Sequence, residues 1–296
     1  MLISDKWKDY ELLDCSSGEK LERWGQYILI RPDPQIIWHS EKTHPDWQNA
    51  DARYERSPSG GGRWRSGGLP ERSNGLPDRS NGLPDRWFVK YSDLTFGVNL
   101  MNFKHTGLFP EQAVNWDYIG KKIKSAKRKI SVLNLFAYTG GATLAAAAAG
   151  ADVCHVDAAR GMVTRARENA QKSGLDGKPI RWIIDDCTKF IERELRRGHT
   201  YDAIIMDPPS YGRGPAGEVW KLEDKLFGFM ELCAKILSDD PLFVLINSYT
   251  TGLSPSTLTY ITQTLLGGHA ESFELGLPVT ASGLVLPCGA TCRWTP

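Results

Sequence analysis

The 296-residue sequence has almost no net charge, no long apolar run and no closely paired cysteines. Its net charge of +1 provides no global field to attract nucleic acid, so any such binding must depend on a local patch. No apolar run approaches the ~20 residues that a membrane-spanning helix needs, so we expect no membrane partner. The first ten residues lack the apolar core of a signal peptide. We therefore expect a cytoplasmic protein.

The six cysteines are scattered, and none forms a C-x-x-C pair. Cys288 and Cys292 lie close in sequence, but no neighbouring histidine or cysteine completes a set of zinc ligands. Reduced thiols are the simpler interpretation. We predict no metal site.

An apolar run at 130–136 leads into a glycine turn, an alanine-rich segment and a second apolar run that ends at Asp157. This order is typical of a nucleotide-binding βαβ unit. Gly140 and Gly141 let the backbone approach a ligand, and free N–H groups at the start of the following helix point toward it. The Asp157 carboxylate can accept both hydroxyls of a ribose. The turn at 134–141 is not G-x-G-x-x-G, which favours a ligand without a pyrophosphate.

Strand-like and helix-like segments alternate from residue 130 to the C-terminus. Strands are predicted at 130–136, 152–156, 180–184, 201–206, 241–247, 271–277 and 283–294. Helices are predicted at 140–149, 159–173, 188–197, 219–237 and 255–266. This alternation predicts an α/β fold whose ligand binds at the carboxyl ends of the strands. Three candidate acids, Asp157, Asp186 and Asp207, follow the second, third and fourth of these strands.

The chain before residue 130 has a different character. We predict an accessory region at 1–86, a hairpin and helix at 87–129, and the main domain at 130–296. Alternating runs at 10–14 and 26–31 make the accessory region mostly β. Its Gly/Pro/Arg-rich loop at 57–86 contains a seven-residue Gly-Leu-Pro repeat at 68–86. Either the repeat is a duplicated surface loop, or it is an arginine-bearing arm that contacts RNA, an idea that its interleaved acids weaken.

Five short motifs occur in the order of a known family: Thr106-Gly-Leu-Phe-Pro-Glu-Gln112, Leu133-Asn-Leu-Phe-Ala-Tyr-Thr-Gly-Gly141, Val156-Asp-Ala158, Asp185-Asp186 and Asp207-Pro-Pro-Ser-Tyr211. In these motifs the chain resembles class I S-adenosylmethionine (SAM)-dependent methyltransferases, in particular the branch of bacterial 23S rRNA large-subunit methyltransferases. The resemblance implies a Rossmann-like seven-stranded sheet of order 3-2-1-4-5-7-6. It also implies SAM as cofactor and large-subunit rRNA as a partner.

The resemblance places cofactor contacts in the same motifs. They are Phe109, Gln112, Asn134, Phe136, Ala137, Tyr138, Thr139, Gly140, Gly141, Asp157, Ala158, Asp185, Asp186, Cys187 and Asp207. We prefer Asp186 over Asp185 for the adenine amine, because strand alternation directs it to the cofactor side. One acid of the pair is expected to cap the next helix. Cys187 is expected to be a small packing residue rather than a nucleophile.

Asp207, Pro208 and Tyr211 are the predicted catalytic residues. The acid and a proline carbonyl can hold an acceptor nitrogen near the methyl group, and Tyr211 can stack on a flat base. A flap is expected at 212–217, and Arg213, Asn247 and Tyr249 are candidate substrate contacts.

Methylation of cytosine at C5 needs an attacking cysteine, which the relatives with that activity carry just after the fifth strand. This chain has Asn247-Ser-Tyr-Thr250 there, which favours a nitrogen or oxygen acceptor. Two alternatives stay open. One is a small-molecule or protein methyltransferase, and the other is a SAM-binding protein without catalysis, against which the intact motif at 207–211 argues.

Overall fold

The computed structural model describes residues 1–57, 61–66, 83–101, 104–213 and 219–296. The chain forms two compact units. The first holds residues 1–2, 112–275 and 288–296, and the second holds 3–111 and 276–287. The predicted domain boundaries at 86 and 129 do not coincide with this division and stay a prediction.

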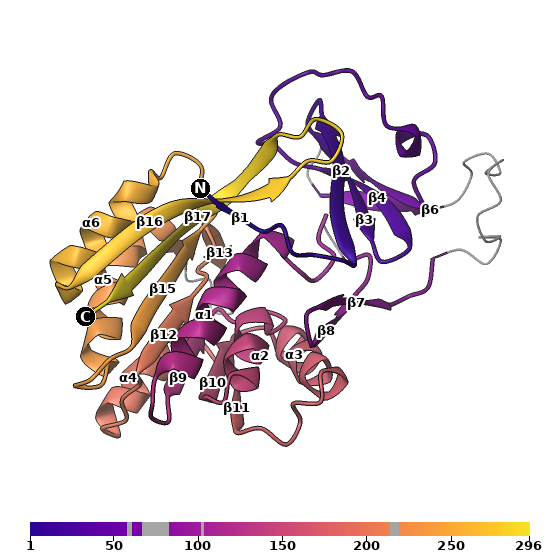
Figure 1. The fold of residues 1–296 in the computed structure, drawn as a ribbon. Coiled ribbons are helices and arrows are strands. Elements are labelled where there is room, and N and C mark those ends of the chain that lie inside the picture. The colour runs from indigo at the N-terminus through magenta and orange to yellow at the C-terminus, as the bar shows by residue number, and fades with distance from the viewer. Residues whose placement is uncertain (58–60, 67–82, 102–103, 214–218) are drawn as a thin grey trace. The chain divides into compact units, whose positions relative to one another are not determined.

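The first unit is built on a mixed eight-stranded sheet of order β1-β16-β17-β15-β12-β9-β10-β11 (Figure 1). Its strands are β1 (Leu2–Ile3), β9 (Ser131–Leu135), β10 (Asp152–Asp157), β11 (Ile180–Ile184), β12 (Ala203–Met206), β15 (Phe243–Ser248), β16 (His269–Pro278) and β17 (Val285–Thr295). Five neighbouring strands of this sheet run parallel, namely β9, β10, β11, β12 and β15, and β17 is antiparallel to β15. Counted from β9 along the chain, seven strands have the order 3-2-1-4-5-7-6, and β1 is an additional edge strand that the sequence did not predict.

Six helices cover the two faces of this sheet. They are α1 (Ala113–Ser125), α2 (Gly141–Ala148), α3 (Arg160–Lys172), α4 (Cys187–Arg196), α5 (Leu222–Ile236) and α6 (Pro255–Leu266). Alternate residues of β9 point to opposite faces: Leu133 and Leu135 join the core under α4 to α6, whereas Val132 joins the core under α1 and α2. Each predicted helix of the α/β region is present. The prediction for α5 began too early, because 219–221 is a strand.

The second unit contains a five-stranded sheet of order β2-β3-β4-β5-β6 and a separate hairpin, β7-β8. The strands are β2 (Tyr10–Ser16), β3 (Glu19–Trp24), β4 (Tyr27–Pro32), β5 (Ala52–Arg56), β6 (Gly62–Ser66), β7 (Trp87–Tyr91) and β8 (Leu94–Val98). The strands at 10–14 and 26–31 and the hairpin are confirmed, but β3, β5 and β6 were not predicted. β3 is rich in charge, and its Glu22 is buried because Arg31 on β4 donates two hydrogen bonds to it, at 2.5 and 2.7 Å. The repeat at 68–86 lies mostly outside the described residues.

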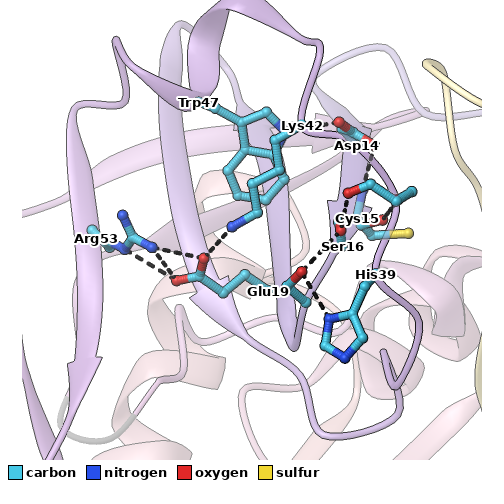
Figure 2. Close-up of polar contacts among 10 residues, drawn as sticks. Asp14, Cys15, Ser16, Glu19, His39, Lys42, Trp47 and Arg53 are labelled. Atoms are coloured by element: carbon cyan, nitrogen blue, oxygen red, sulfur yellow. Dashed lines mark hydrogen bonds and ion pairs between the residues drawn. The ribbon is translucent and has the colours of Figure 1, made fainter.

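Polar contacts fasten the segment after β4 to this sheet (Figure 2). The Trp47 indole donates to Asp14 Oδ2 at 2.7 Å, and the Lys42 ammonium lies 4.1 Å from the centre of the Trp47 ring. Glu19 accepts hydrogen bonds from Lys42 and from the Arg53 guanidinium. These contacts cover the apolar cluster that Trp47 joins in the second unit.

No helix in the described part of the chain is long and apolar enough to cross a membrane. Among the same residues, no three His, Cys, Asp or Glu side chains gather into a group that could hold a metal ion. The six cysteines all lie in the described ranges; none of them forms a disulfide, and five are buried.

Glu194 on α4 is the centre of a buried ionic cluster in the first unit. Its carboxylate is fully buried and accepts hydrogen bonds from Arg181 and from the Tyr201 hydroxyl, each at 2.8 Å. Burial opposes ionisation, but these hydrogen bonds outweigh it and lower the pKa of Glu194 to about 2. The cluster therefore stabilises the fold while Glu194 is ionised.

We expect Glu194→Gln to lower the free energy of unfolding by about 2–3 kcal/mol at pH 7, because the guanidinium of Arg181 loses its partner. The folded pKa lies below the ordinary value of 4.5, so this stabilisation is complete above pH 4.5 and is lost as the pH falls toward 2. Denaturant unfolding at several pH values measures it. Glu192→Gln, on the exposed side of the same helix, is the control. An equal difference at pH 3 and pH 7 would contradict the mechanism.

Candidate cofactor and active site

The carboxyl ends of four neighbouring strands bring the predicted acids together. β10 and β12 flank β9, and Leu135 of β9 is paired with both Val156 and Met206. Short backbone bonds continue the register past the strand ends: Ala137 N–H donates to Val156, and Asp185 N–H donates to Asp157, each at 3.1 Å. Asp157, Asp185 and Asp207 thus follow β10, β11 and β12 at one rim of the sheet, whereas the sequence analysis named Asp186 rather than Asp185 for the third strand.

The turn between β9 and α2 has an unusual backbone. Phe136 and Tyr138 have φ angles of 53° and 50°, and Gly140 has a φ of 89°. Left-handed conformations are costly for aromatic residues and persist where surrounding contacts enforce them, frequently at ligand sites. The enforcing contacts here are hydrogen bonds from Phe136 N–H to Cys187 Sγ (3.4 Å) and from Tyr138 N–H to Asp157 Oδ2 (2.8 Å).

Asp157 is the acid most closely tied to this turn. Its second oxygen, Oδ1, accepts from Ala159 N–H at 2.8 Å. Burial raises the pKa of the Asp157 carboxyl, while the two backbone hydrogen bonds oppose that rise. An ionised carboxylate offers about four lone-pair positions, so two remain for a ligand. The first residue outside α3 is Ala159, so Asp157 is not its cap. The predicted cofactor contact of the neighbouring Ala158 stays a prediction.

The two acids after β11 have different local partners. Asp186 is exposed and caps α4, because its Oδ1 accepts from Lys189 N–H at 2.9 Å. Asp185 is ion-paired with Arg193. The helix cap is thus Asp186, the acid that the sequence analysis preferred as the partner of the adenine amine. Which of the two acids contacts adenine stays a prediction. Cys187 is buried, and burial raises the pKa of its thiol, as expected for a packing residue rather than a nucleophile.

Asn134 supports the turn from beneath. Its side chain is buried and donates to Thr143 Oγ1 at 2.8 Å, and Thr143 is hydrogen-bonded to His155 Nδ1 at 2.9 Å. Burial lowers the pKa of His155 to about 3, so the imidazole is neutral. This chain of contacts joins β9, α2 and β10. A direct cofactor contact of Asn134 stays a prediction, as do those of Ala137 and Thr139.

An aromatic group holds the motif that follows β12. The Trp220 indole on β14 (Val219–Lys221) donates to Pro209 O at 2.7 Å. The centre of its ring lies 5.2 Å from the ring centre of Phe136 and 5.6 Å from the ring centre of Phe229. Pro208 is buried, whereas Tyr211 is 54% exposed at the start of β13 (Tyr211–Arg213). An exposed ring on a fixed backbone is suited to stacking on a flat substrate.

Part of the predicted flap is a strand. β13 pairs with β14 in antiparallel register, so 212–213 is regular structure, and 214–218 lies outside the described residues. The structure gives no account of the Arg213 side chain. Phe109 belongs to the second unit, and its predicted cofactor contact stays a prediction.

Gln112, Asn247 and Tyr249 belong to one polar network. Gln112 Nε2 donates to the Tyr249 hydroxyl at 2.7 Å, and its Oε1 accepts from Asn115 Nδ2 at 2.9 Å. Asn115 also donates to Asn247 Oδ1 at 3.1 Å. Gln112 and Asn247 are almost fully buried, at 7% and 3% exposed, and Tyr249 is half-buried. Of the three, Tyr249 is the least buried, and the substrate contacts predicted for Asn247 and Tyr249 stay predictions.

Sequence reasoning missed the residues that support the site: Asn115, Thr143, His155, Trp220 and Arg293. Each acts through a partner outside its own helix or strand, so no local motif marks it. A buried polar residue in the first turn of an otherwise apolar helix face, such as Asn115, is the only signal available in the sequence.

Gly141 begins α2 under the ring of Trp116. A Cβ at this position would lie 2.5 Å from Cζ2 of that ring. We expect Gly141→Ala to cost about 1–3 kcal/mol of unfolding free energy and to weaken SAM binding, because the start of α2 must shift. Gly120→Ala, where a Cβ would meet nothing within 4 Å, is the control and should be neutral or slightly stabilising. Thermal unfolding and calorimetric SAM titration measure both. Equal behaviour of the two variants would contradict the steric argument.

A parallel sheet with a carboxylate rim and a strained glycine turn at its carboxyl edge defines a nucleotide-binding α/β protein. The model of the S-adenosylmethionine-dependent methyltransferase family matches residues 72–232, and the chain belongs to this family. SAM is therefore its cofactor. The residues present fit SAM: Asp157 keeps lone pairs for ribose hydroxyls, and the turn and the start of α2 place backbone beside them without intervening side chains at 140–141.

The chain is similar to proteins of the same class over different lengths. A SAM-dependent methyltransferase from Agrobacterium tumefaciens is 38% identical, with a TM-score of 0.89 over all of this chain and 93% of that chain. Ribosomal RNA large subunit methyltransferase K/L of Shewanella loihica is 37% identical over 117 residues, 39% of this chain and 16% of the relative. Ribosomal RNA large subunit methyltransferase I of Aeromonas salmonicida is 35% identical over 120 residues, 40% of this chain and 29% of the relative.

Proposed function

We propose that this methyltransferase modifies RNA in the cytoplasm, with 23S rRNA as the substrate and nitrogen or oxygen rather than cytosine C5 as the acceptor. The observation that carries the proposal is Asp207-Pro-Pro-Ser-Tyr211, which ends β12 with an acid and presents an exposed ring beyond it. The similarity to two rRNA methyltransferases supports RNA as the substrate, although the chain matches less than a third of either relative.

The chain's own residues would do three things at this rim. When bound, SAM supplies an electrophilic methyl group on its sulfonium. Asp207 and the carbonyl of Pro208 would hold the acceptor nitrogen or oxygen in line with that methyl group. Tyr211 would stack on the base and set its plane. Trp220 would keep the motif in place through its bond to Pro209.

The acceptor proposal follows from the position of the thiols. The stretch 247–250 at the end of β15 contains no cysteine, and Cys187 at the same rim is buried with a raised pKa. A thiol that stays protonated and enclosed is a poor nucleophile toward a pyrimidine ring. Transfer to carbon through a covalent intermediate is therefore disfavoured.

A small-molecule or protein substrate is the second candidate. The observation that favours it is the charge of the chain, whose 36 basic and 35 acidic residues leave a net +1. RNA enzymes gain affinity from phosphate contacts, and a neutral chain must concentrate such contacts in a small area.

The test is transfer of labelled methyl from SAM to total RNA and to ribosomal subunits from a strain that lacks this gene. We expect label in large-subunit RNA, and nucleotide mapping then identifies the acceptor atom. Tyr211→Ala should retain SAM binding and lose most transfer, because base stacking is worth about 1–3 kcal/mol. SAM binding without label in any RNA would overturn the RNA substrate in favour of the second candidate.

A further inference from the structure

The polar network around Asn115 has a direction that its chemistry fixes. Arg293 on β17 donates to Asn115 Oδ1 through Nε at 3.2 Å and through a terminal nitrogen at 2.8 Å. A guanidinium has five N–H donors and no acceptor. The atom of Asn115 that faces Arg293 must therefore be its oxygen, and its amide nitrogen must face the other way.

The same constraint passes to Gln112. Asn115 Nδ2 points toward three oxygens: Gln112 Oε1 at 2.9 Å, Asn247 Oδ1 at 3.1 Å and Thr291 Oγ1 at 3.2 Å. With Gln112 reversed, two amide nitrogens would face each other inside the protein, where an unmatched donor is costly. Gln112 Nε2 is thus directed to the Tyr249 hydroxyl, which accepts its hydrogen bond at 2.7 Å.

The network is rigid as well as directed. Asn115 is 1% exposed and Thr291 is fully buried. The Arg293 guanidinium carbon lies 4.3 Å from the centre of the Tyr118 ring, and Arg293 also donates to the Val114 carbonyl at 3.2 Å. Fully satisfied buried networks of this kind hold one arrangement, because every alternative leaves a group without its partner.

Tyr249 lies at the rim that the proposed function uses. It follows β15, whose partner β12 leads into Asp207, and Thr250 donates to Ser210 Oγ at 2.8 Å, which ties the two strand ends together. We infer that Arg293 and Asn115 are positioning residues that act through Gln112 to hold the Tyr249 side chain in place at the rim where the base to be methylated binds. This inference rests on the proposed function.

The first test uses turnover at saturating SAM on large-subunit RNA. We expect Tyr249→Phe to lower kcat/KM for RNA roughly 10- to 100-fold, because the hydroxyl through which Gln112 holds this side chain is lost. Asn115→Asp, which cannot donate to Gln112, should cause a loss of the same order. The double variant should lose no more than Tyr249→Phe alone, since Asn115 acts through Tyr249. Thr262→Val, which removes a buried hydroxyl bonded within α6, is the control for simple destabilisation and should keep its turnover.

Additive losses in the double variant would overturn the inference, because they would show that Asn115 contributes to folding alone. Full turnover of Tyr249→Phe would overturn it as well. A second measurement does not need RNA: the side-chain amide resonance of Gln112, assigned by its loss in Gln112→Glu, should shift in Tyr249→Phe because its acceptor is gone. Absence of methyl transfer by the unmodified chain, together with this shift, would reject the proposed RNA substrate and retain the directed network. An unshifted resonance would reject the network itself.

Discussion

Replacing Asp157 by alanine is expected to weaken SAM binding by at least about 100-fold, a loss of two charge-assisted hydrogen bonds to a ribose. The carboxylate stands at the end of β10 and already orders the turn through Tyr138 N–H and Ala159 N–H. The variant therefore loses ligand contacts and the restraint on the turn together. Calorimetric titration with SAM measures the affinity, and thermal unfolding shows whether the fold persists.

Two comparisons separate these effects. Asp157→Asn retains a hydrogen-bond acceptor for the turn but has no charge, so it should bind SAM more weakly than the unmodified chain and more tightly than Asp157→Ala. Asp152→Asn, at the opposite end of β10 where the carboxylate pairs with Lys129, should bind SAM normally. Normal affinity in Asp157→Ala would remove Asp157 from the site.

The same carboxylate predicts a pH dependence for SAM binding. Burial raises the pKa of Asp157, so protonation begins at a higher pH than for an ordinary aspartate. The protonated form cannot accept hydrogen bonds from both ribose hydroxyls while it also accepts those from Tyr138 N–H and Ala159 N–H. Affinity should therefore fall as the pH drops through that raised pKa, and the fall should be absent in Asp157→Asn.

Local sequence signals predicted the parallel half of the first unit well. Apolar runs bounded by glycine or an acid mark β9, β10 and β12, because a strand buried on both faces needs such a run and a ligand rim needs polar ends. β3 was missed because its sequence, Glu-Lys-Leu-Glu-Arg-Trp, is charged, and only the partner Arg31 on another strand makes a buried Glu22 stable. A pattern confined to one segment cannot contain that information.

The site shows the same limit. Asp185 and Asp186 are adjacent, and the sequence cannot tell which one caps α4, since the answer depends on where the helix begins relative to β11. The bond between Arg293 and Asn115 joins residues 178 positions apart. Such contacts can be identified only once the strand order is known. The sequence motifs therefore identify the rim, but the residues that support it are found only in the folded structure.

Replacing Asp207 by asparagine is expected to lower turnover about 1,000-fold at saturating SAM, the scale of losing a positioned catalytic carboxylate. Asp207 is half-buried, and its backbone N–H donates to Leu135 O at 3.4 Å, so β9 fixes the backbone at this position of the rim. Asparagine can therefore occupy the same position. What it lacks is the negative charge that would balance the positive charge developing on an acceptor nitrogen as the methyl group arrives.

Single-turnover transfer of labelled methyl to large-subunit RNA measures this step without the influence of product release. Asp224→Asn, an exposed acid in the first turn of α5, is the matched control and should transfer methyl at the normal rate. A rate within tenfold of normal would mean that Asp207 shapes the turn only, and that the Pro208 carbonyl and Tyr211 position the acceptor without it.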